Sequence, residues 1–199
     1  ECRRWSATHA ASQARWNCSL LLFTGARHHP RSHMKRTKLI NDPAELVALF
    51  RSVDSPERRA VLALLAGGWT PTSELADKFG DEAFAAITYF EKFKLVESRW
   101  EVTDGKPEKA YRTFYNAFQI STSLTFEETE QLLTVVLLTP EEFDEIEGKI
   151  MEMVGDEGRF ANDIARELEL TTLQLKGLVR RSVKFNSRGH NIVPIREEK

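Results

Sequence analysis

The chain has 199 residues, of which 41% are hydrophobic and 29% are charged, and its formal net charge at pH 7 is −2. This length suits one ordinary domain or two small ones, and the apolar fraction is too high for a disordered chain. No apolar run approaches the roughly 20 residues that a membrane-spanning helix needs, so we expect no membrane partner.

The first part of the chain differs in composition from the rest. Residues 1–33 contain five arginines against a single acid, both cysteines and four of the five histidines. They show no amphipathic period, so we expect residues 1–36 to form a disordered tail, either a leader or a non-native extension. Histidines at 28, 29 and 33 on such a tail are typical of adventitious ligands, and we expect no metal site and no cofactor.

Residues 34–199 contain no cysteine. This excludes a disulfide framework and a thiolate metal site from that part of the chain. A reducing compartment fits this composition, and we expect the protein to be cytoplasmic.

Helix start signals divide the remaining chain. Asp42, Ser55 and Thr139 each place a side-chain oxygen before a proline at the first helical position. Capping boxes are predicted at Asp42, Thr125, Thr139 and Thr171, which have Glu or Gln three residues on. Helices are therefore expected to start near residues 43, 56, 126, 140 and 172, with others at 72–79, 82–93 and 160–168.

Two hairpins complete the pattern. Residues 97–103 and 110–115 alternate on either side of an Asp-Gly turn at 104–105, and residues 183–185 and 191–195 repeat the plan around 186–189. The order helix, helix, helix, hairpin thus occurs twice, separated by an apolar helix. The sequence predicts an α+β, mostly helical fold, with two winged helix-turn-helix units in tandem joined by a long apolar helix.

This organisation gives a predicted division of the chain. We expect a first winged-helix domain at 37–122, a linker or dimerisation helix at 123–138 and a second winged-helix-like domain at 139–199.

The first unit carries a recognisable series of features. Ser55-Pro56-x-Arg58-Arg59 precedes the run VLALL, Glu74-Leu75-Ala76 follows, and Leu95-Val96 comes after the third helix. In this order they resemble the DNA-binding core of ArsR-type winged helix-turn-helix transcription regulators, especially the archaeal two-domain type, over residues 43–120. The resemblance implies a dimer that places helix 82–93 in a major groove of double-stranded DNA. Metal sensing through cysteine pairs on that helix is excluded, because this helix has none.

Candidate DNA contacts in the first unit lie on this helix and on the hairpin. With the apolar residues facing the core, the outward positions are expected to be Ala85, Thr88, Tyr89 and Lys92. Thr88 and Tyr89 can reach a base or a phosphate, but the helix lacks the Arg, Asn and Gln that usually read guanine and adenine. The hairpin carries Lys106, Lys109 and Arg112, which suit phosphate contacts and equally suit an ordinary exposed hairpin.

The second unit offers further candidates on its last helix. The expected outward residues are Thr172, Gln174, Lys176, Arg180 and Arg181. Gln174 is a candidate adenine reader, and Arg180 or Arg181 a candidate guanine or phosphate contact. Residues 123–199 contain ten Lys or Arg and sixteen Asp or Glu. The acids concentrate in residues 140–153, which either leaves one face positive or makes an ordinary solvated helix face. The alternative to DNA contact by this unit is a dimerisation or partner-binding module.

The connecting segment 126–138 is apolar nearly all round in its second half. Such a helix is expected to be buried, either in the seam between the two units or in a symmetric dimer interface. We favour a dimer interface formed by Leu132, Leu133, Val136 and Leu137.

No catalytic motif is present, and outside residues 1–33 the only histidine is His190, so we expect no enzyme. The sequence favours a sequence-specific DNA-binding transcription regulator that acts as a homodimer. The alternative is a winged-helix protein-interaction module without specific DNA binding. The first unit keeps that alternative open, because residues 34–122 hold thirteen basic and thirteen acidic residues.

Overall fold

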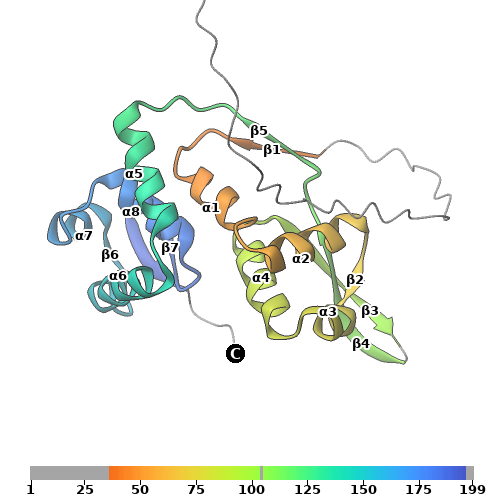
Figure 1. The fold of residues 1–199 in the computed structure, drawn as a ribbon. Helices are drawn as coiled ribbons and strands as arrows, with labels where there is room; N and C mark the ends of the chain where they lie inside the picture. The colour runs from red at the N-terminus through yellow and green to blue at the C-terminus, as the bar shows by residue number, and fades with distance from the viewer. Residues whose placement is uncertain (1–35, 104, 196–199) are drawn as a thin grey trace, which may run out of the picture. The chain divides into compact units, whose positions relative to one another are not determined.

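The structure is a computed structural model that describes residues 36–103 and 105–195 (Figure 1). The predicted tail and its histidines lie outside the described residues, apart from Arg36. The described residues all belong to one compact unit. Its elements are β1 (Thr37–Ile40), α1 (Glu45–Arg51), α2 (Pro56–Gly67), β2 (Thr70–Pro71), α3 (Thr72–Phe79), α4 (Asp81–Lys92), β3 (Val96–Thr103), β4 (Lys106–Thr113), β5 (Ala117–Ile120), α5 (Phe126–Leu137), α6 (Pro140–Val154), β6 (Arg159–Phe160), α7 (Ala161–Glu167), α8 (Thr172–Arg181), β7 (Phe185–Arg188) and β8 (Asn191–Pro194).

Four of the five predicted side-chain caps begin helices where expected. Thr125, Thr139 and Thr171 each form a complete capping box at the start of α5, α6 and α8. Ser55 accepts from the backbone N–H of Arg58 at the start of α2. Asp42 differs from the prediction, because its carboxylate accepts from the backbone N–H of Ala44 and α1 begins only at residue 45.

Each predicted hairpin gains a short third strand. The sheets have the orders β2-β4-β3 and β6-β8-β7, and all pairs in them are antiparallel. We call α2 to β4 (residues 56–113) the first module and α6 to β8 (residues 140–194) the second module. Both follow the order helix, strand, helix, helix, hairpin, and this α+β arrangement is consistent with a winged helix.

Strands β1 and β5 form a parallel pair that the sequence did not indicate, with Thr37 opposite Ala117 and Ile40 opposite Ile120 (Figure 1). Both strands are four residues long and come from distant parts of the chain. Strands this short carry little periodic signal, so their pairing depends on contacts that only the folded chain supplies.

The buried side chains of residues 36–103 and 105–195 form two clusters. One consists of the first module together with Ala48 of α1. The other joins the second module to Ile40, to Leu46 and Val47 of α1, and to residues of α5. Helix α1 therefore contributes to both cores, although the predicted division at residues 37–122 assigns it to the first domain.

Helix α5 is buried on one face only. Its Leu132 and Val135 belong to the core around the second module, whereas Leu133 and Leu137 are 44% and 75% exposed. Within one chain the contacts of α5 with α8 and α1 cover a single side of the helix, so burial of its other side in a dimer interface stays a prediction. None of the helices in the described ranges is long and apolar enough to span a membrane.

Gly177 allows α8 to approach its neighbours closely. A Cβ at this position would lie 3.3 Å from a methyl group of Val135 in α5 and 3.4 Å from one of Val47 in α1. Gly148 also lies in the interior of a helix, but a Cβ there would meet nothing within 4 Å. The two glycines therefore differ in packing rather than in secondary structure.

We predict that Gly148→Ala raises the free energy of unfolding by about 0.5–1 kcal/mol, because alanine is the better helix former. Gly177→Ala should not gain this increment, since its methyl group enters a filled contact, and Gly177→Leu should lose about 1–3 kcal/mol. Urea denaturation of the three variants measures these differences. Equal gains at both glycines would contradict the close approach of α8 to α5 and α1.

Candidate nucleic-acid interface

The four candidates on α4 do not share one exposed face. Ala85 and Thr88 are exposed, and the Thr88 hydroxyl donates to the carbonyl of Phe84. Tyr89 is only 2% exposed, and its hydroxyl donates to the Arg180 carbonyl at 3.1 Å. The expectation that Tyr89 and Lys92 face outward is wrong, because the end of α8 covers this side of α4.

Lys92 makes the densest polar contact between the modules. Its ammonium donates to the carbonyl oxygens of Val179 at 2.9 Å, Ser182 at 2.5 Å and Phe185 at 2.7 Å. Burial, and to a lesser extent the nearby charge of Arg180, lowers the pKa of Lys92 to about 7. The full set of three donors requires the protonated form, so this contact changes near neutral pH.

The hairpin of the first module leaves two of its three candidates free for phosphates. Lys106 and Lys109 are exposed. Arg112 instead forms an ion pair with Glu97 at 2.6 Å and lies over the ring of Trp69. The predicted contacts therefore reduce to the two lysines near the tip of the hairpin.

The second module brings several candidates to one concave surface. Thr172, Lys176 and Arg180 are spaced four residues apart on α8, and all three line a cavity of about 270 Å³. The facing wall contains Ser187 and His190 of the β7–β8 hairpin. Asp42 is the acidic residue among the lining side chains. This places two cations and several hydrogen-bonding groups between the last helix and its hairpin.

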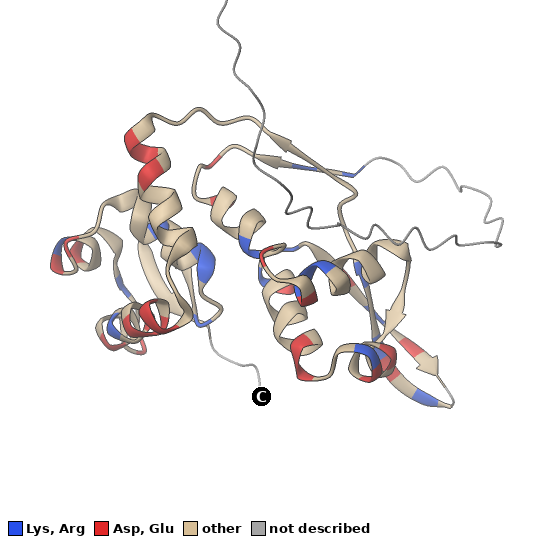
Figure 2. Cartoon of the chain, in the orientation of Figure 1, with Lys and Arg blue, Asp and Glu red and all other residues tan. Residues whose placement is uncertain are grey.

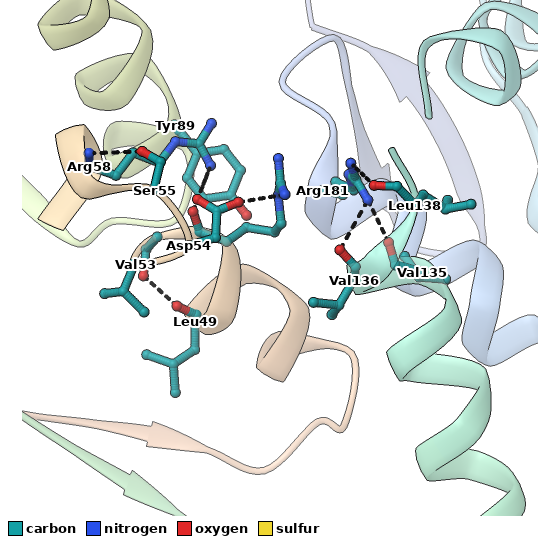
Figure 3. Close-up of polar contacts among 12 residues, drawn as sticks. Leu49, Val53, Asp54, Ser55, Arg58, Tyr89, Val135, Val136, Leu138 and Arg181 are labelled. Carbon is teal, nitrogen blue, oxygen red and sulfur yellow. Dashed lines mark hydrogen bonds and ion pairs between the residues drawn. The ribbon is translucent and has the colours of Figure 1, made fainter. Parts of the chain in front are cut away.

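Two other α8 candidates have structural partners. The Gln174 side-chain oxygen accepts from the backbone N–H of Thr171, completing the capping box. Arg181 is 5% exposed, so the prediction that it faces outward is wrong. Its guanidinium donates to the carbonyls of Val135, Val136 and Leu138 at the end of α5 (Figure 3).

The proposed dimer residues are split between two environments. Leu132 lies in the core, Val136 is half-buried, and Leu133 and Leu137 are exposed. Acidic residues colour the first turn of α5 and much of α6 in Figure 2. The acidic surface of this region is thus largely carried by elements other than α8.

The described residues contain no group of three or more His, Cys, Asp or Glu side chains placed to hold a metal ion. The contacts that sequence reasoning missed are those of Arg51, Asp54 and Arg58, which meet around Tyr89. The alternation of basic and acidic residues over 51–58 is visible in the sequence, but it equally suits an exposed turn.

We predict that Lys92 makes stability depend on pH. Its folded-state pKa lies below the ordinary value of 10.5, so between about pH 7 and that value the unfolded chain binds more protons than the folded one. The contribution of this group to stability therefore rises with pH across this window, by at most about 1.4 kcal/mol per pH unit.

Urea denaturation of Lys92→Met at several pH values tests this. The free energy of unfolding of the unaltered protein should rise more steeply above about pH 7 than that of the variant. Lys78→Met removes a half-exposed lysine of α3 and should leave the slope unchanged. Parallel slopes for all three proteins would show that Lys92 is not the titrating group.

Comparison of the sequence with known protein families finds one match. A family model described as ArsR transcriptional regulator matches residues 40–196, which is more than half of the chain. The search of curated proteins finds no match to this chain. The family match includes both modules and the helices α1 and α5 that pack with them. The chain therefore belongs to the ArsR transcriptional regulator family.

Proposed function

We propose that the protein regulates transcription by binding double-stranded DNA as a homodimer through two winged helices in tandem. The family membership supports a transcription regulator. The repeated element order and the matching strand orders β2-β4-β3 and β6-β8-β7 support two winged helices. The protein occupies its promoter site and catalyses no reaction.

One observation carries the assignment of the main DNA contact to the second module. Thr172, Lys176 and Arg180 lie on the side of α8 that faces the β7–β8 hairpin, around one concavity. A winged helix presents its last helix to the major groove and its hairpin to the backbone, so this is the surface that DNA would meet. Lys176 and Arg180 can contact phosphates or guanine, and Thr172 can bond to either a base or a phosphate.

The first module has a smaller part in this proposal. The exposed side chains of α4 include Glu82 and Glu91, which repel phosphates, and two of its four candidates are covered. Lys106 and Lys109 on the hairpin remain available for the backbone. Such contacts add affinity without reading the sequence.

Helix α5 is the proposed dimer interface. Leu133 and Leu137 stay exposed while their neighbours Leu132 and Val135 fill the core. A second copy would cover these leucines and place two α8 helices on two half-sites.

The alternative function as a protein-interaction module is favoured by a different surface. Trp100 and Val102 lie on the same face of β3 and are 70% and 74% exposed. An exposed apolar pair on a hairpin suits a protein partner better than a phosphate backbone.

We predict that Lys176→Glu lowers DNA affinity at least about tenfold and reduces the dependence of log affinity on log salt by about one unit. Lys149→Glu makes the same charge change on the exposed face of α6 and should leave the affinity within about twofold. Fluorescence anisotropy with genomic fragments, beginning with the protein's own upstream region, measures both. Equal losses in the two variants, or no binding by a folded dimer at low salt, would favour the protein-interaction module.

We predict that Leu133→Glu combined with Leu137→Glu gives a folded monomer, because each carboxylate would have to be desolvated in a closed interface. Sedimentation velocity reports the mass, and circular dichroism checks the helical content. Trp100→Glu, on the exposed hairpin, serves as the control that should stay dimeric. An unaltered dimer in the double variant would remove α5 from the interface.

A further inference from the structure

A second cavity, of about 370 Å³, lies between α4 and the second module. Four cationic side chains line it: Arg51, Arg58, Arg181 and Lys184. Tyr89 and Phe143 supply aromatic walls. The cavity is separate from the concavity between α8 and its hairpin, with which it shares no lining residue.

Within residues 36–103 and 105–195, Arg181 has no directly paired carboxylate, and the charge of Asp54 acts on it only from a distance. Its two terminal nitrogens bond to neutral carbonyl groups, and among the described residues it forms no ion pair. In the part of the chain that the structure describes, its buried Nε–H finds no acceptor. Burial and the nearby charge of Arg51 lower the pKa of this guanidinium to about 10. A buried donor without a partner is costly, and here it belongs to a cation that lines a cavity.

Arg51 and Arg58 share one carboxylate. Asp54 lies 2.5 Å from the Arg51 guanidinium and 3.4 Å from that of Arg58. Figure 3 shows Asp54 beside Arg58 and Tyr89. The Arg58 guanidinium also lies over the ring of Tyr89, 4.8 Å from its centroid. Each arginine therefore keeps donors that Asp54 alone does not occupy.

The carboxylates on the other wall of the cavity are either paired with residues other than the arginines or exposed. Glu147 is 3% exposed, forms an ion pair with Lys184 at 2.6 Å and accepts from the Ser182 hydroxyl at 2.5 Å. Asp144 also lines the cavity and is exposed. Four cations thus face three carboxylates in all, counting Asp54, and the imbalance is concentrated on the arginine side.

We propose that this cavity binds a small oxyanion, a carboxylate or phosphate group of a soluble metabolite, on the guanidinium groups of Arg51, Arg58 and Arg181. Planar guanidinium groups match the oxygens of both groups, and all three arginine side chains are mostly buried. The size of the cavity admits a small molecule and excludes a DNA duplex. The site goes beyond DNA binding and gives the regulator a place for an effector that needs no metal.

The position of the site gives it a regulatory consequence. Its lining comes from α1 and α2, from α4, from α6, and from the end of α8 and the segment that follows it. An anion held by these elements stabilises the arrangement in which α4 contacts the second module. Effector binding and the exposure of Tyr89 and Lys92 are then linked. An anion that binds more tightly when α4 contacts the second module favours that contact, and the contact keeps these two side chains covered.

Calorimetric titration and thermal unfolding without DNA test the site. The probes are inorganic phosphate and citrate, compared with chloride at constant ionic strength. We expect saturable binding of at least one of them and a rise in Tm of about 3 °C at tenfold excess over its Kd. Absence of saturable binding of both up to about 10 mM would overturn the proposal.

Variants locate the bound anion. Arg51→Gln should weaken binding at least tenfold, whereas Arg166→Gln, which removes an 80% exposed guanidinium on α7, should leave it within twofold. Equal effects of the two variants would identify an adventitious ion only. Ala85→Leu narrows the cavity without altering its charge and should also weaken binding. This second variant tests the site even if the Arg51 variant fails to fold.

Two further readouts separate this site from the DNA surface. Lys176→Glu should bind the anion as the unaltered protein does, even where it loses DNA. In ¹⁵N NMR spectra the Arg181 Nε–H signal should shift when the anion is added. If that signal stays in place while the backbone amide signals of α8 shift, the anion binds on the DNA surface instead and the proposal is refuted.

Discussion

The last carbonyl groups of α5 and of α8 obtain their hydrogen bonds from cationic side chains elsewhere in the chain. A helix leaves its final carbonyls without internal partners, and burial makes that loss costly. Arg181 satisfies the end of α5, and Lys92 satisfies the end of α8 and the turn beyond it. Because Arg181 is itself the last residue of α8, the two contacts are coupled. They join α5, α8 and α4, and through α4 the first module.

Because of this coupling, the two modules differ in which polar side chains they leave on their surfaces. Using Lys92 and Tyr89 to close α8 removes them from the outer surface of α4, and the exposed residues left there include two glutamates. Helix α8 is affected differently. Its Arg181 is turned inward, but Lys176 and Arg180 stay on the face toward the hairpin. One helix thus serves as a structural support, and the other keeps the groups suited to phosphates and bases. The two helices differ because the buried end of α8 requires hydrogen-bond donors and α4 supplies them.

Local signals predicted most of the fold and only part of the site. The threonines at 125, 139 and 171 set helix starts through short-range bonds, so the sequence located α5, α6 and α8 correctly. Helical periodicity also separated Ile87 and Phe90 from the opposite side of α4. It could not show that Tyr89 joins the core of its own module and contacts α8, because a side chain outside the apolar stripe of a helix is assumed to face water. The same reason explains Arg181 and the contribution of α1 to the second core.

The arginine cluster is difficult to explain as a stabilising device. Desolvating cations costs free energy, and buried charged groups are often replaced by apolar ones without loss of stability. Arg181 could cap α5 with its terminal nitrogens in an otherwise apolar setting, yet it lies near Arg51 and Arg58 with a single shared carboxylate between the latter two. Mutual repulsion of this kind is relieved by an anion, and the cavity beside the cluster leaves room for one. The arrangement that holds α4 against α8 therefore contains an unbalanced charge at its centre, and neutralising that charge would favour the contact between the modules.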